Sequence, residues 1–247
     1  MKPNETLWNT PPVNGVNGHN GSNGHHGSHT GKHGFLEELG DQHVATSVET
    51  PLREDAFELD DDTKIELIAQ NFREIMMILG LDLEDDSLKG TPKRVAKMYV
   101  KEIFSGLNPA NKPDITLFEN AYQYKEMLVE KDITFFSNCE HHFVPIYGKV
   151  HVAYISSGKV VGLSKLNRIV QYYARRPQVQ ERMTRQIAES LKEALSTEDI
   201  AVIVDANHMC VSSRGIQDTT SSTITSDYSG KFKQPETKQE FLKYIGK

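Results

Sequence analysis

Two short clusters of cysteine and histidine constrain this chain more than any other feature of its sequence. The first reads Cys139-Glu140-His141-His142, and the second reads His208-Met209-Cys210. Both cysteines of the protein lie in these clusters, together with three of the four histidines that follow residue 43. Thiolate and neutral imidazole are the ligands that Zn²⁺ prefers. The sequence therefore predicts one soft metal site that joins two distant parts of the chain.

The spacing within the clusters indicates how the ligands are shared. Cys139 and His142 are three positions apart and can reach one ion from a single turn of backbone, and Cys210 can supply a third ligand. If the second cluster is a strand, His208 and Cys210 face the same side of it. Neighbours in sequence rarely point at the same atom, so His141 is interpreted as an acid or base beside the metal. Three protein ligands leave a fourth tetrahedral position for water, as in catalytic zinc sites.

Two other interpretations of the clusters remain open. One is a closed Cys₂His₂ structural zinc site, in which no position is left for water. The other is a Cys139–Cys210 disulfide. A lone disulfide is unusual in a reducing compartment, and the sequence opens without the pattern of a signal peptide. We therefore expect a cytoplasmic protein with free thiols.

Length and charge narrow the function classes. The chain has 247 residues and a net charge of −6, and no apolar run approaches the roughly 20 residues that span a bilayer. A protein that binds nucleic acids without sequence preference would instead carry a positively charged surface, so the net charge disfavours this class. Residues 1–50 contain two lysines and five acidic residues, so half of the net charge lies there. The remainder is close to neutral, which leaves room for a local basic pocket.

The N-terminal segment has the composition of a solvated tail. Residues 13–34 hold seven glycines and five histidines and almost nothing apolar. Such a stretch cannot bury enough surface to offset its chain entropy, although its histidines could bind metal weakly. We predict a disordered Gly/Asn/His-rich tail over 1–56 and one folded domain over 57–247.

The hydrophobic pattern predicts an α+β domain. An apolar stripe behind Asp60-Asp61-Asp62 predicts a helix that Gly80 ends, and Thr91-Pro92 predicts the start of a helix that runs to Ile103 and ends at Gly106. Further helices are predicted at 165–174, from after Pro177 to about 195, and at 236–245, with strands at 127–136, 148–156, 200–204 and 219–226. This order favours antiparallel pairs over alternating βαβ units, and no Gly-rich phosphate loop is present.

Five motifs together resemble one known family. They are TPKRVAKM at 91–98, CEHH at 139–142, GLSKLNR at 162–168, RPQVQER at 176–182, and the run from His208 to Gly215. The chain from about 58 to 245 resembles GTP cyclohydrolase I. The resemblance implies the tunnelling fold, in which ββααββ units with antiparallel strands form an oligomeric barrel. Here a helical part at 57–110 would precede the tunnelling-fold part at 111–247, in a homodecamer with active sites between subunits.

The resemblance also implies an activity. The family uses Zn²⁺ to hydrolyse GTP to formate and 7,8-dihydroneopterin triphosphate, the first step of pterin and tetrahydrofolate biosynthesis. GTP and further copies of this chain are then the expected partners, and neither nucleic acid nor a membrane is expected. Matched by motif, the zinc ligands are Cys139, His142 and Cys210, and the catalytic residues are His141, His208 and Ser164. The matched substrate-binding residues are Arg94 (from a neighbouring subunit), Lys165, Arg168, Gln180, Glu181 and Arg214.

The residue types suit that chemistry. A zinc-bound water with a pKa of about 7 can attack the weakly electrophilic C8 of guanine, and histidine can give and take protons at neutral pH. A carboxylate such as Glu181 can accept both N1–H and the N2 amine of guanine, and several cations can hold a triphosphate. On their own, however, these charged residues could equally be ordinary surface groups.

Three other functions remain as alternative interpretations of the sequence. A nucleobase deaminase expects H-x-E and P-C-x-x-C, and neither lies near these ligands. A nitrile reductase of the same fold would need a nicotinamide cofactor and would make His142 and Cys210 superfluous as ligands. A non-catalytic GTP-binding or zinc-stabilised assembly protein would share the architecture, and formate release from GTP separates it from the enzyme.

Overall fold

The structure is a computed structural model that describes residues 47–247. Its centre is a five-stranded sheet in the order β5-β2-β3-β6-β7. The strands are β2 (Met127–Cys139), β3 (Pro145–Ile155), β5 (Pro177–Gln178), β6 (Ile200–His208) and β7 (Thr223–Tyr228). The pairs β2–β3, β3–β6 and β6–β7 are antiparallel, and only the two-residue β5 pairs in parallel, with the end of β2. The α+β prediction is confirmed.

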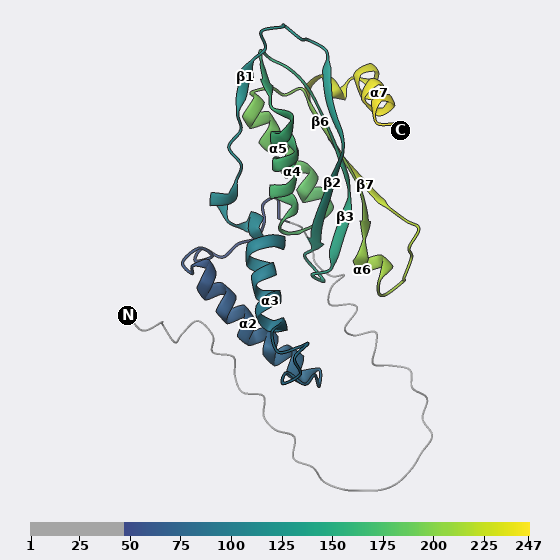
Figure 1. The fold of residues 1–247 in the computed structure, drawn as a ribbon. Coiled ribbons are helices and arrows are strands. Elements are labelled where there is room, and N and C mark those ends of the chain that lie inside the picture. Colours follow the sequence, from purple (N-terminus) through teal and green to yellow (C-terminus); the bar gives the residue numbers. More distant parts are fainter. Residues whose placement is uncertain (1–46) are drawn as a thin grey trace. The chain divides into compact units, whose positions relative to one another are not determined.

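Helices α4 (Leu163–Ala174) and α5 (Gln180–Leu195) lie side by side along one face of this sheet (Figure 1). On β6, alternate residues such as Val202 and Val204 pack into the core beneath these helices. Ala201 and Ile203 point the other way, toward Phe232 of η4 (Gly230–Lys233) and Phe241 of α7 (Pro235–Tyr244). Both faces of β6 are therefore covered, which explains why its sequence is a continuous apolar run without polar alternation.

The helical part before the sheet begins with α2 (Asp61–Ile78). The Asp60 side chain caps it by accepting a hydrogen bond from the Thr63 N–H. Gly80, at φ 81°, ends it, and the next N–H, that of Leu81, reaches back to the Met76 carbonyl. These are the start and stop that the sequence predicts, because only glycine adopts that backbone conformation without cost.

Helix α3 (Thr91–Met98) continues as the π-helix η1 (Tyr99–Ile103) and is followed by the short turns η2 (Ser105–Leu107) and η3 (Pro109–Asn111). Gly90 is the N-cap, so Thr91 is the first helical residue and not the cap. The helix ends at Ile103 and not at Gly106, which lies within η2. A Cβ at this position would lie 2.0 Å from the Tyr172 carbonyl oxygen, so glycine is needed for close packing against α4.

The apolar stripe of α2 is only partly buried within the chain. Ile65 and Met76 are buried, whereas Ile78 is 84% and Leu79 70% exposed. A separate two-stranded sheet of β1 (Leu117–Glu119) and β4 (Lys159–Val161) packs on the main core through Val161 and Leu117. Exposed apolar residues in such a row are typical of a surface that another chain covers.

The described part of the chain begins earlier than the domain start that composition places at residue 57. The Ser47 carbonyl accepts a hydrogen bond from Arg182, and the Thr50 hydroxyl accepts one from Arg176. Backbone carbonyls and single hydroxyls leave no periodic signal, so the sequence pattern does not detect such contacts. The remaining tail prediction, for residues 1–46, lies outside the described residues. Among residues 47–247, no helix is long and apolar enough to cross a membrane.

Candidate metal centre and proton-transfer site

The strand register brings the two cysteine and histidine clusters together. Cys139 is the last residue of β2, and the turn that follows is closed by hydrogen bonds from the Phe143 N–H to the Cys139 carbonyl and from the Cys139 N–H to the Val144 carbonyl. Strand β3 starts directly after this turn and pairs Ile146 with His208 at the end of β6. The two clusters are therefore held at one end of the sheet by the β2–β3–β6 ladder.

Cys139, His142 and Cys210 form a compact group of possible metal ligands. All three ligand atoms lie within 4.8 Å of one another, and the Cys139 Sγ to His142 Nδ1 distance is 3.7 Å. Bond lengths of about 2.3 Å to sulfur and 2.1 Å to nitrogen place two tetrahedral ligands about 3.6 Å apart. The donor types and spacing thus fit a soft metal ion such as zinc.

The structure places the other cluster residues outside this group. Both cysteines are free thiols, and neither His141 nor His208 belongs to the three-residue set. The expectation that His208 and Cys210 share a strand face is wrong. Strand β6 ends at His208, and Cys210 lies in the short helix α6 (Met209–Ser212), which turns its side chain toward Cys139.

Burial and the neighbouring Cys139 thiol raise the pKa of Cys210 to about 11. Two adjacent sulfurs cannot both ionise readily when they face each other in a half-buried site. A cation between them reverses that preference, because the thiolate is the form that binds metal. The site therefore suits a bound cation better than two ionised thiols without one.

His208 is held by a glutamine. Its Nε2 atom lies 2.7 Å from Gln180 Oε1, and Gln180 is the first residue of α5. Burial lowers the pKa of His208, and the nearby Glu181 carboxylate partly offsets this effect. Glu181 is exposed, and its charge acts on His208.

The side chain of Gln180 does not match its predicted role in substrate binding. It is 2% exposed, and its amide nitrogen donates to the Val204 and Thr223 carbonyls within the chain. Both of its N–H groups are thus directed inward, away from a ligand in solvent.

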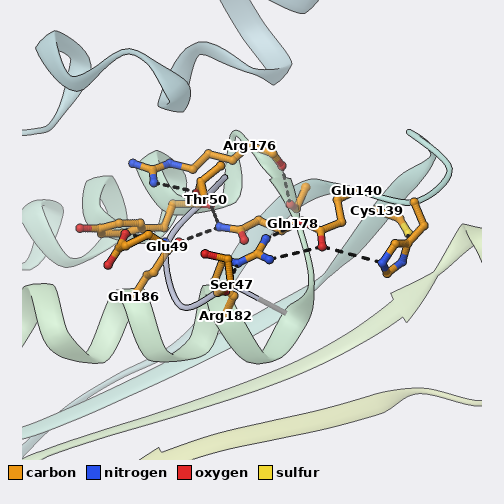
Figure 2. Close-up of polar contacts among 12 residues, drawn as sticks. Ser47, Glu49, Thr50, Cys139, Glu140, Arg176, Gln178, Arg182 and Gln186 are labelled. Atoms are coloured by element: carbon orange, nitrogen blue, oxygen red, sulfur yellow. Dashed lines mark hydrogen bonds and ion pairs between the residues drawn. The ribbon is translucent and has the colours of Figure 1, made fainter. Parts of the chain in front are cut away.

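An ion pair supports the turn that carries the first cluster. The buried Arg182 guanidinium donates to both carboxylate oxygens of Glu140, and its Nε donates to the Ser47 carbonyl. Figure 2 shows Arg182 between Ser47 and Glu140. The Glu140 carboxylate also lies 3.8 Å from His141 Nε2. Through Arg182, Glu140 therefore connects the turn that carries the first cluster to α5 and to Ser47.

The predicted cationic residues separate into two places. Arg214 lies at the metal centre, with Nη1 2.9 Å from His142 Nε2. That contact needs His142 Nε2 as the acceptor, so it is incompatible with a ring that binds metal through Nδ1 and carries its proton on Nε2. Arg94 is elsewhere, on α3, where it donates to the Ser87 carbonyl and the Thr91 hydroxyl.

Ser164, Lys165 and Arg168 lie at the far end of β2 from the metal centre. Asn167, between them in sequence, donates to Glu130 near the start of β2, whereas Gln178 pairs with Cys139 at its end. At about 3.3 Å per residue, Glu130 and Cys139 are roughly 25–30 Å apart. Within one chain, these residues and the metal centre are therefore too far apart to bind the same nucleotide.

Two buried partners of the site were not predicted as such: Arg182 was assigned no role, and Gln180 was assigned to substrate and not to His208. A helical pattern could have found Gln180, because Met183, Thr184, Ile187 and Leu191 repeat from it at the spacing of one helix face, and all are buried. Nothing comparable marks the Glu140–Arg182 pair. Its partners are distant in sequence and look like ordinary surface charges.

Sequence comparisons with known proteins identify one family. The sequence model of the GTP cyclohydrolase I family matches residues 68–246. A protein named GTP cyclohydrolase 1 from Flavobacterium johnsoniae is 62% identical over 211 residues, which cover 85% of this chain and 95% of that one. Proteins of the same name from Erwinia tasmaniensis and Salmonella arizonae are each 55% identical, over 82% and 83% of this chain and 92% and 93% of theirs.

Proposed function

The chain belongs to the GTP cyclohydrolase I family, and from that premise we propose that it hydrolyses GTP to formate and 7,8-dihydroneopterin triphosphate with the help of one zinc ion per chain. The observation that carries the proposal is the group of Cys139, His142 and Cys210, whose donor atoms lie within 4.8 Å of one another. This set leaves a coordination position for water and so differs from a closed structural site. We further propose a cytoplasmic enzyme that feeds pterin or tetrahydrofolate synthesis.

The residues around the metal centre have separate roles in the proposed reaction. When bound, zinc supplies a water whose lowered pKa makes it a nucleophile at neutral pH. His208 donates the proton that makes guanine C8 attackable, and His141 carries protons in the later steps. Glu181, whose charge acts on His208, accepts the guanine N1–H and N2 amine. Arg214 lies at the metal centre, where its Nη1 atom is 2.9 Å from His142 Nε2. It binds a phosphate oxygen of GTP in place of that contact.

We propose that each active site is completed by a second copy of the chain. Ser164, Lys165 and Arg168 lie roughly 25–30 Å along the sheet from the metal centre, farther than one GTP extends. Two further observations support assembly. The apolar end of α2 is exposed, and within residues 47–247 the outer edge of β7 and most of the outer edge of β2 have no strand partner. Closure of such edges into a tunnelling-fold barrel, as a homodecamer, removes them from solvent.

The first expected result tests the activity itself. Purified protein should release formate from GTP, and a strong zinc chelator should abolish the release because the nucleophile depends on the metal. Restoring zinc, but not magnesium, should restore formate. Direct assay of formate and of the fluorescent oxidised pterin product measures this. Turnover that persists in fully metal-free protein would contradict the zinc proposal.

The second expected result tests the shared site. Cys139→Ala and Arg168→Ala alone should be nearly inactive, because each removes one half of every site. Co-expression with two different tags should yield mixed oligomers in which about one quarter of the sites have both halves intact, as random assembly of a symmetric oligomer gives. Tandem affinity purification followed by formate assay measures the recovery. Mixed oligomers that contain both chains yet remain inactive would show that each site is built within one chain.

A further inference from the structure

We propose that Gln180 is a positioning residue that holds the His208 ring as its Nε2–H tautomer and so leaves Nδ1 as the ring nitrogen without a hydrogen in the neutral ring. This inference rests on the proposed function, because it assigns the initiating proton transfer to His208. It replaces the expected contact between the Gln180 side chain and guanine, which the burial of that side chain prevents.

The orientation of the Gln180 amide follows from its partners. Its nitrogen lies 3.2 Å from the Val204 carbonyl on β6 and 2.9 Å from the Thr223 carbonyl on β7. A carbonyl oxygen can only accept a hydrogen bond, so both partners require the NH₂ end of the amide. The reversed amide would place its oxygen against two carbonyl oxygens in a buried site and would lose both of these hydrogen bonds.

The tautomer of His208 follows from the amide. With the NH₂ end directed at β6 and β7, the remaining Oε1 atom faces His208 Nε2 at 2.7 Å. That oxygen accepts and cannot donate, so Nε2 must carry hydrogen, both in the neutral ring and in the imidazolium. Nδ1 is then the ring nitrogen that carries no hydrogen in the neutral ring.

The fold keeps this arrangement rigid. Gln180 is 2% exposed and is the first residue of α5, so its backbone is set by the helix while its side chain ties the helix to β6 and β7. His208 is the last residue of β6, the strand that also supplies the Val204 carbonyl. The ring and the group that orients it are thus anchored to the same ladder, and little conformational entropy remains to be lost when substrate binds.

A fixed tautomer suits repeated proton transfer. The His208 imidazolium gives its Nδ1 proton to N7 of the purine, the positive charge moves to the purine, and the ring becomes the neutral Nε2–H form that Gln180 already holds. Taking a proton back at Nδ1 in a later step restores the imidazolium. No rotation of the ring is needed between the steps. A ring free to adopt the other tautomer would spend part of its time with no acceptor at the working nitrogen.

The tautomer can be read directly by nitrogen NMR on the zinc-loaded, full-length enzyme labelled with ¹⁵N-histidine. The difference spectrum against His208→Gln isolates the signals of His208 from those of the other histidines. In the wild type at a pH where the ring is neutral, we expect a protonated Nε2 and an unprotonated Nδ1. In Gln180→Met, which keeps the volume but removes the acceptor, we expect a mixture of both forms.

Kinetics test whether the orientation matters. Gln180→Met should lower kcat about tenfold or more while KM for GTP changes less than about threefold, which is smaller than the roughly 10⁴-fold loss seen where a catalytic histidine is held in the wrong tautomer. Gln180→Glu should not recover the loss, because its second oxygen would face the Val204 and Thr223 carbonyl oxygens to which the amide nitrogen now donates. Gln178→Met is the matched control. Gln178 is a buried glutamine that donates to the Tyr173 carbonyl and to Gln186, not to a histidine, and its loss should leave kcat within about threefold.

Several outcomes would overturn the proposal. They are a wild-type spectrum with a protonated Nδ1, an unchanged tautomer in Gln180→Met, or an equal loss of activity in Gln178→Met. If Gln180→Met fails to assemble or to retain zinc, the wild-type spectrum decides the question, because a protonated Nδ1 there contradicts the proposal. Failure of the proposed function looks different, because it would remove formate release from the wild type while leaving the His208 tautomer as predicted.

Discussion

Replacing Cys139, His142 or Cys210 with alanine is expected to remove the bound zinc and to reduce formate release from GTP to background. The three donor atoms lie within 4.8 Å of one another, so each supplies a third of the protein ligand set. Two remaining ligands do not hold zinc in competition with buffer and chelators, and without the ion there is no activated water. Zinc content per chain, measured beside formate release, checks the expectation.

The matched control for these variants is His151→Gln. His151 is a buried histidine whose ring accepts a hydrogen bond from the Asp132 N–H, and it lies on β3 away from the metal group. Its replacement should leave the zinc content at about one ion per chain. Full zinc retention in all three ligand variants would contradict the assignment. Loss of zinc without loss of formate release would separate the metal from the chemistry.

His208→Ala is expected to keep zinc and GTP binding and to slow turnover by about 10²–10⁴-fold, the usual contribution of a general acid or base. The ring is held by Gln180 at one nitrogen and lies outside the three-residue metal group. Because we assign it the first proton transfer, opening of the guanine ring should slow as much as formate release does. Stopped-flow absorbance of the purine and a separate formate assay resolve the two steps.

His141→Ala provides the comparison within the same site. Its Nδ1 lies 3.8 Å from the Cys139 sulfur and its Nε2 lies 3.8 Å from the Glu140 carboxylate, yet it is outside the three-residue group. We expect zinc to be kept and a later step to slow. If His208→Ala instead opened the ring at the normal rate, or lost its metal in step with its activity, a closed structural site that includes His208 would become the better description.

Much of the metal centre could be predicted because its signal is local. Cys139 and His142 are three residues apart, and thiol and imidazole groups limit the chemistry wherever they cluster. The helix boundaries were equally accessible, since Asp60 and Gly80 act through their own turns of backbone. The continuous apolar run of β6 marked a strand, although only the packing of α7 and η4 explains why both of its faces are apolar.

What the sequence by itself determined is therefore which residue types meet at the metal centre, the α+β class, and membership of the GTP cyclohydrolase I family. Tertiary structure decided how these residues are used. Cys210 reaches the site from a short helix and not from a strand face, and Gln180 turns inward to His208 instead of outward to substrate. Such outcomes depend on partners such as Val204 and Thr223, which are far from Gln180 in sequence and contribute only backbone carbonyls. Because every residue has that group, no sequence pattern reveals which one a buried side chain will bind.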